Sequence, residues 1–169
     1  MTAIFPMLAA YNRWANRRLY DAAGLLTDEN YRADCGAFFR SLHGTLNHIL
    51  VADRIWMQRF TGEGDAPDRL DAILFEELGP LRDARRAEDE RILRYVEGLG
   101  EADLASTFTY RRVTSPEVFT QPRAPALLHV FNHQTHHRGQ AHAILTRLAG
   151  EAPALDLMLF QRTGSATPA

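Results

Sequence analysis

The sequence lacks what several classes of protein require. A single cysteine, Cys35, excludes an intramolecular disulfide, and no Cys-x-x-Cys pair is present to bind zinc. No apolar run approaches the ~18 residues that span a bilayer, and no basic leader precedes an apolar stretch at the start. The net charge is -2 without any Lys/Arg-rich run, so no nucleic-acid or membrane partner is expected. We expect a cytoplasmic protein in which Cys35 is a packed or loop residue.

The length and composition are those of one globular domain. The chain has 169 residues, of which 46% are apolar and 24% charged, enough to form a hydrophobic core without disulfides or metal. We find no internal repeat and no linker that divides the chain. We therefore expect a single domain over residues 1–162, and we interpret residues 163–169 as a flexible tail.

Apolar residues at helical spacing predict four long helices. Their expected ranges are 3–23, 41–60 with an end at Gly62, a stretch within 70–97, and Pro125 to Leu148 or Ala149 before Gly150. In the third, Gly79-Pro80 marks either a kink or the true start. Four such helices bury their apolar faces most economically against one another, so we predict an all-α fold, a four-helix bundle.

Shorter elements are expected between and after these helices. Residues 24–36 predict a connection with one helical turn opened by Thr27. Residues 105–122, rich in Thr, Phe, Tyr and Val around "TSPE", predict either a short hairpin or an extended crossover. A short C-terminal helix is expected over about 155–161.

The segment "HVFNHQTHHRGQ", residues 129–140, holds four of the seven histidines. On a helical wheel His129, His136 and His137 fall within about 60° of His133, on a face that also carries Ile144 and therefore points inward. Histidines four residues apart stand one above the other and can converge on one ion. The metal-binding pair would then be His129 and His133, or His133 and His137. A hydrogen-bonded polar core layer and a pH switch are the alternatives.

The second long helix offers one more inward histidine. Ala52 and Ile55 lie within about 60° of His48, whereas His43 lies about 140° away and is not expected to be a partner. One imidazole from this helix and two from the last would make a three-histidine site. Such a site leaves a coordination position open, which is the arrangement expected for catalysis.

Three segments carry a resemblance to a known family. "YNRWAN" (11–16), "SLHGTLNHILVADRIW" (41–56) and "HVFNHQTHHRGQAHAIL" (129–145) resemble the DinB family, the DinB/YfiT-like metal-dependent enzymes. The resemblance implies a four-helix bundle that binds a divalent metal ion, usually zinc or nickel. It implies His48, His133 and His137 as the metal ligands, with His129 and His136 as neighbours only.

The same resemblance implies a function. Some members are similar to S-transferases that use a low-molecular-weight thiol, bacillithiol or mycothiol. A metal with an open coordination position suits this activity, since it activates a bound water or thiol. We therefore expect a transferase or hydrolase acting on a small-molecule substrate, in a chain that can form a homodimer. No catalytic residue is assigned. The alternatives are a non-catalytic metal or small-ligand binding stress-response protein, and a helical scaffold that dimerises through its first or fourth long helix.

Polar residues near the histidines are given supporting roles. Asp53 lies about 140° from His48 on the helix, so we expect it to pair with an arginine or to cap a helix. Gln140 shares the face of His133 and either hydrogen-bonds to a ligand imidazole or packs. Arg138 points away from the site, where a salt bridge is expected.

Aromatic and glycine residues give weaker signals. Tyr11, Trp14 and Trp56 either wall a substrate pocket or belong to the core. Gly44 and Gly139 are interpreted as places where helices approach closely.

Overall fold

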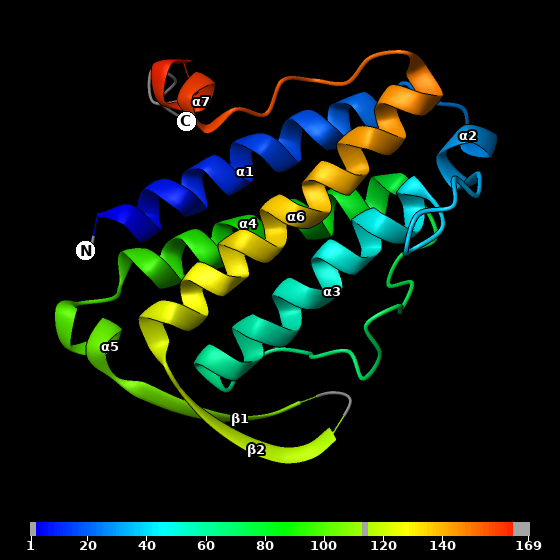
Figure 1. Ribbon diagram of the computed structural model, residues 1–169. Helices are drawn as coiled ribbons and strands as arrows, with labels where there is room; N and C mark the ends of the chain where they lie inside the picture. The colour runs from blue at the N-terminus through cyan, green and yellow to red at the C-terminus, as the bar shows by residue number, and fades with distance from the viewer. Residues whose placement is uncertain (1–2, 113–114, 164–169) are drawn as a thin grey trace.

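The computed structural model describes residues 3–112 and 115–163 and shows a mostly helical protein with a small two-stranded sheet (Figure 1). The predicted helical class is therefore confirmed. The elements in chain order are α1 (Ile4–Ala23), α2 (Asp28–Arg32), α3 (Leu42–Thr61), α4 (Leu78–Glu97), α5 (Glu101–Ala105), β1 (Thr107–Arg112), β2 (Ser115–Pro122), α6 (Arg123–Ala149) and α7 (Leu157–Thr163). Thr163, which the sequence placed in the tail, is the last residue of α7; the tail residues 164–169 lie outside the described residues.

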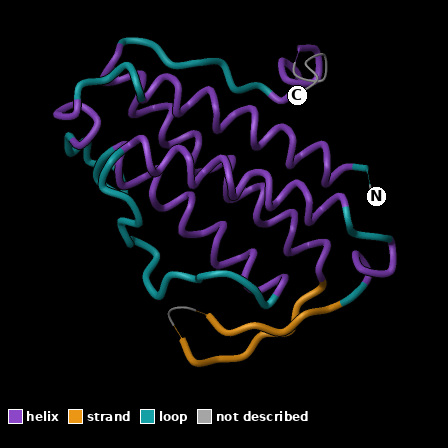
Figure 2. Tube along the Cα trace, turned by 180° about the vertical axis from the view of Figure 1, so that it is seen from behind, coloured by secondary structure: helices purple, strands orange, loops and turns teal. Residues whose placement is uncertain are grey.

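The long helices α1, α3, α4 and α6 lie side by side (Figure 1). Helix α1 packs against α4 and α6, and α3 packs against the same two helices. Figure 2 shows from behind that the hairpin runs across one end of this group, next to the long loop that joins α3 to α4. The packing of α3 on α6 brings His48 to the histidine-rich segment, which lies 81 or more residues further along the chain.

Local capping residues explain the predicted helix ends. Ser41 caps α3 by accepting a hydrogen bond from a backbone N–H in its first turn, and Gly62 ends the helix with a φ of 75°. Thr27 caps α2 in the same way. Pro80 lies in the first turn of α4, so Gly79-Pro80 marks the start of that helix and not a kink.

Strands β1 and β2 pair in an antiparallel hairpin, which decides between the two alternatives for this segment. Tyr110 of β1 lies opposite Phe119 of β2, and the register shifts between Arg111 and Arg112. Strand β2 runs directly into α6, with Pro122 as the residue before the helix. Helix α6 therefore starts two residues earlier than Pro125, the expected start.

Buried apolar side chains form a core at both ends of the helices. The cluster nearest the hairpin includes Phe60, Phe108 and Phe131, and the cluster at the opposite end includes Leu46 and Leu145. A third cluster lies beneath α7. It contains Tyr11 and, partly buried, Trp14, so the core interpretation holds for these two aromatic residues.

A buried charged network connects the four long helices. Asp53 Oδ2 of α3 lies 2.6 Å from Arg85 Nη1 of α4, and Arg85 Nη2 lies 3.0 Å from Asp89 Oδ1. Asn16 of α1 donates a hydrogen bond of 2.9 Å to the same Asp89 oxygen. On α6, Arg138 is only 2% exposed and donates hydrogen bonds to Asn12 and Gln134. The predicted pairing of Asp53 with an arginine is thus confirmed.

Arg138 points away from the three histidines, as predicted, but the expectation of a salt bridge was wrong. Its guanidinium hydrogen-bonds to the neutral side-chain oxygens of Asn12, Gln134 and Thr135, and within the described residues no carboxylate lies within 4.0 Å of it. The reason is that α1 covers this face of α6 and removes Arg138 from solvent.

Gly44 and Gly139 differ in how closely other atoms approach them. A side chain at Gly44 would collide with the backbone carbonyl of Phe39, so the close approach is to the loop before α3 and not to another helix. Gly139 has no heavy atom within 4 Å of the position its Cβ would take. The close approach predicted for Gly139 was therefore wrong.

Candidate metal centre

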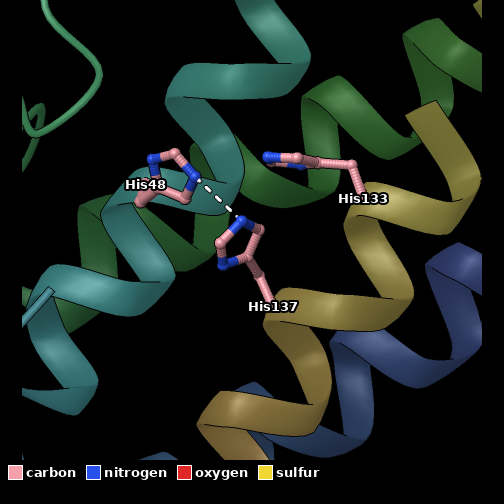
Figure 3. A group of neighbouring side chains, drawn as sticks. All are labelled: His48, His133 and His137. Carbon is pink, nitrogen blue, oxygen red and sulfur yellow. Dashed lines mark hydrogen bonds between the residues drawn. The ribbon is translucent and has the colours of Figure 1, made fainter. Parts of the chain in front are cut away.

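His48, His133 and His137 converge between two helices. His48 projects from α3, while His133 and His137 project from successive turns of α6 toward it (Figure 3). Each offers one ring nitrogen, and these three atoms all lie within 4.8 Å of one another. His48 and His137 are buried and His133 is half-buried. The three-histidine group could hold a metal ion.

The Nδ1 atoms of two of these rings are engaged by oxygen acceptors. His48 Nδ1 lies 2.7 Å from the backbone oxygen of Leu70, and His137 Nδ1 lies 2.7 Å from Gln140 Oε1. An oxygen of this kind only accepts, so both Nδ1 atoms carry the proton of the neutral imidazole. Gln140 thus fills the hydrogen-bonding role that was one of its two interpretations.

As a consequence, the two Nε2 atoms face each other with lone pairs. His48 Nε2 and His137 Nε2 lie 3.2 Å apart, as the dashed line in Figure 3 marks. With both protons on Nδ1, no hydrogen remains between these atoms, and two lone pairs at this distance repel. A tetrahedral zinc ion with Zn–N distances of 2.0–2.1 Å would place two ligand nitrogens about 3.3 Å apart. The separation therefore fits a cation shared by the two rings.

The electrostatic environment disfavours a proton as that cation. Burial and the charge of a protonated His137 lower the pKa of His48 to about 4, although the hydrogen bond to the Leu70 carbonyl acts in the opposite direction. Burial and the neighbouring imidazoles lower the pKa of His133 to about 3, and burial lowers that of His137 too. All three rings are neutral near pH 7, which is the state that binds metal ions.

Two groups at the site come from loops and were missed by the sequence analysis. The ring of Phe39 stacks on His48, with centroids 3.7 Å apart and an interplanar angle of 17°. It also meets His137 edge-on at 5.6 Å. The second missed group is the carbonyl of Leu70, in the loop between α3 and α4. Neither residue lies in a periodic pattern, so no sequence signal pointed to them.

A cleft of about 370 Å³ begins at His48 and His133 and extends to the hairpin. Trp56 lines it, which supports the pocket interpretation for this aromatic residue, whereas Tyr11 and Trp14 do not. The wall beyond the histidines is made by Trp56, Arg59, Leu70, Tyr110, Arg112 and His129.

The remaining candidate histidines lie around the group without completing it. His129 is in the cleft wall, with its ring centroid 5.2 Å from Trp56 and 6.0 Å from His133. His136 is exposed and its ring packs on His137. His43 hydrogen-bonds to the backbone of Phe75, away from the site, as its position on the helix predicted.

The fold and this site define a mostly helical protein with a three-histidine group that could hold a metal ion. The chain belongs to the DinB family, whose model matches residues 1–165. It is 29% identical over 153 residues to protein DinB of Bacillus subtilis (strain 168), covering 87% of each chain. The resemblance found in the sequence is therefore confirmed.

A solved structure shares the fold. The crystal structure of a DinB-like protein from Bacillus cereus ATCC 10987 superposes with a TM-score of 0.62 at 19% sequence identity. The match covers 83% of this chain and 90% of that chain. At this identity the likeness concerns the fold alone. Among the helices that the structure describes, none has the length and apolar character needed to cross a membrane.

Proposed function

We propose that this chain is a divalent-metal-dependent enzyme that acts on a small molecule, as a thiol-dependent S-transferase or a hydrolase. Its metal ligands would be His48, His133 and His137. The observation that carries the proposal is the pair of Nε2 lone pairs, on His48 and His137, held 3.2 Å apart in a buried place. A buried arrangement of this kind is unfavourable without a cation.

The residues of the chain would prepare the site for that chemistry. A bound divalent ion would lower the pKa of a water or thiol and polarise an electrophile. The Leu70 carbonyl and Gln140 hold the ligand rings in the orientation that directs Nε2 inward. Phe39 covers one face of His48, so access is from the cleft at His48 and His133.

Zinc and nickel are the proposed ions, because both accept imidazole nitrogen. The proposed thiol is of the bacillithiol or mycothiol type. We also propose that residues 1–162 act as one domain, that the four long helices form the bundle expected for the family, and that the protein is a cytoplasmic homodimer. Light scattering of the purified chain tests the dimer directly.

Metal content is the first test of the proposal. The protein is purified without added metal, and zinc and nickel are measured by mass spectrometry. We expect about one equivalent per chain in the wild type and a large loss in His48→Ala, His133→Ala and His137→Ala. His136→Ala is the matched control, because its exposed ring lies beside the group. Equal metal content in all five proteins would contradict the ligand set.

Turnover is the second test. Consumption of bacillithiol or mycothiol is followed with a panel of epoxides, alkyl halides and maleyl compounds, and hydrolysis is followed with esters and amides. We expect turnover in the wild type that is lost in His133→Ala and kept in His136→Ala. Equal rates for the wild type and His133→Ala would remove the catalytic proposal. Retained metal without any turnover would favour a non-catalytic binding protein.

A further inference from the structure

The wall of the cleft next to the three histidines carries positive charge without any acidic residue. Arg59 of α3 and Arg112 of β1 both line it, and none of the described residues in its lining is aspartate or glutamate. The chain as a whole has a net charge of -2. The cleft therefore differs in charge from the rest of the molecule, at the place from which a small molecule would reach the histidines.

The contacts of the two arginines are to aromatic rings and a backbone carbonyl. The Arg59 guanidinium lies 4.6 Å from the ring of Trp56 and 4.5 Å from that of Tyr110, and it donates a hydrogen bond to the carbonyl of Arg111. Arg112 lies 4.2 Å from the ring of Phe119. These contacts hold the side chains in place without neutralising their charges.

Other arginines of the described chain do lie near carboxylates, which makes the lack of an acidic residue in the cleft informative. Seven arginines of the described chain lie within 4.0 Å of a carboxylate: Arg13, Arg17, Arg32, Arg40, Arg69, Arg85 and Arg91. Across the same residues, neither Arg59 nor Arg112 has such a partner. Arg59 is half-buried, and both its burial and the charge of Arg112 lower its pKa. A negative charge in the cleft would offset both the cost of burying the Arg59 charge and its repulsion from Arg112.

We propose that the cleft selects a small organic anion, whose negative group pairs with Arg59 and Arg112 while another part of the same molecule reaches the three histidines. Trp56 and Tyr110 line the same cleft, with ring centroids 5.5 Å apart, and provide an apolar surface for the body of the molecule. A guanidinium pairs with an oxyanion through parallel hydrogen bonds, which gives direction as well as charge. The inference rests on the proposed function, because it assigns the histidines as the reacting end.

Thiol probes of graded length test the inference. Cobalt(II) replaces the native ion, since its absorption spectrum reports thiolate binding. The probes are 2-mercaptoacetate, 3-mercaptopropionate and 4-mercaptobutyrate, each compared with its neutral amide. We expect at least one acid to bind about tenfold more tightly than its amide in the wild type. In Arg59→Gln this preference should fall to about threefold or less.

Two further variants keep the test decisive. Arg17→Gln removes an exposed arginine that does not line the cleft, and it should keep the wild-type preference. This control also cancels differences in thiol acidity between acid and amide. Arg112→Gln is exposed and should weaken the preference; it decides the question if Arg59→Gln does not fold. Equal binding of acids and amides by the wild type would overturn the inference, as would a preference unchanged in Arg112→Gln and Arg59→Gln.

A metal-free measurement separates this inference from the proposed function. The side-chain Nε–H signal of Arg59 is followed by nuclear magnetic resonance while 3-mercaptopropionate or its amide is added. A shift with the acid alone supports the anion site even if the protein binds no cobalt, which would contradict the proposed metal site. Cobalt binding without any preference for acids overturns the anion site and leaves the proposed function standing.

Discussion

The charged network around Arg85 and the three-histidine group occupy different sides of the same helices. On α6, His133 and His137 face the histidine group, while the next residues, Gln134 and Arg138, face the network. In the network, charges of opposite sign meet across helices: Arg85 lies within 3.0 Å of carboxylate oxygens of both Asp53 and Asp89. In the histidine group, two neutral rings face each other with their Nε2 atoms.

The difference separates buried polar groups that stabilise the fold from buried polar groups that could bind a ligand. The charges of the network are neutralised by the chain itself. Removing one member therefore leaves the others charged and unpaired, which lowers the stability of the fold. In the histidine group, His48 and His137 donate hydrogen bonds from their outer Nδ1 atoms, and among the described residues no group of opposite charge joins the three rings at the centre. We propose that an ion from outside the chain completes the histidine group.

Removing the centre of the network should have the largest effect. Arg85→Met keeps an unbranched apolar stem but leaves Asp53 and Asp89 buried without their cation. We expect the free energy of unfolding of the metal-free protein to fall by about 3–5 kcal/mol. Urea unfolding measures this value, with Arg86→Met, a change at an exposed neighbour, as the control. A loss below about 1 kcal/mol would mean that the network contributes little.

Removing a histidine should lower the free energy of unfolding mainly by removing the gain from metal binding. At a zinc concentration 100 times its Kd, binding should stabilise the wild type by about 2.7 kcal/mol. His48→Ala should lose this gain, while its metal-free stability should fall far less than that of Arg85→Met, because the facing lone pairs are removed. Thermal unfolding with zinc and with a chelator gives both values. A zinc-dependent shift that persists in His48→Ala would contradict the comparison.

Removing the hydrogen bond to His137 should have an intermediate effect. Gln140→Leu leaves His137 Nδ1 without its acceptor, so the ring is no longer held in the orientation that directs Nε2 inward. We expect zinc affinity to fall about 10–100-fold. Competition with a chelating dye measures the affinity. The control is Thr146→Val, on the same helix, and unchanged affinity in Gln140→Leu would show that packing alone orients the ring.

Acidification by about half a pH unit below 6.5 should give the smallest change. The pKa values of His48 and His133 in the folded chain, about 4 and about 3, lie below the ordinary value of 6.5. The unfolded chain therefore takes up protons first, and metal-free stability should begin to fall as the pH drops below about 6.5 and continue to fall toward pH 4. Urea unfolding across this range measures the slope. The double variant His48→Ala/His133→Ala should show a shallower slope from pH 6.5 to 5.

The sequence predicted what local patterns determine. The long helices follow apolar spacing, and their ends follow capping residues such as Ser41 and Gly62. Helical spacing also limited the metal pair to His129 with His133 or His133 with His137. The choice between these pairs depends on where α3 crosses α6, which spacing within one helix does not contain.

The parts that the sequence did not predict arise from tertiary contacts. A salt bridge was expected for Arg138 because its own helix carries no sign that α1 covers it and supplies the neutral oxygen of Asn12 instead. The acceptor for His48 is a backbone carbonyl, which any residue at position 70 would supply. Phe39 lies in a loop, where no periodicity indicates which way a ring points.

The alternation of faces on α6 limits how the length of the chain can change. One residue inserted in α6 before His133 would turn everything after it by about 100°. Arg138 would then be directed away from Asn12, and His133 and His137 would be directed away from His48. Insertions and deletions within the part of α6 that precedes His133 should therefore be tolerated poorly.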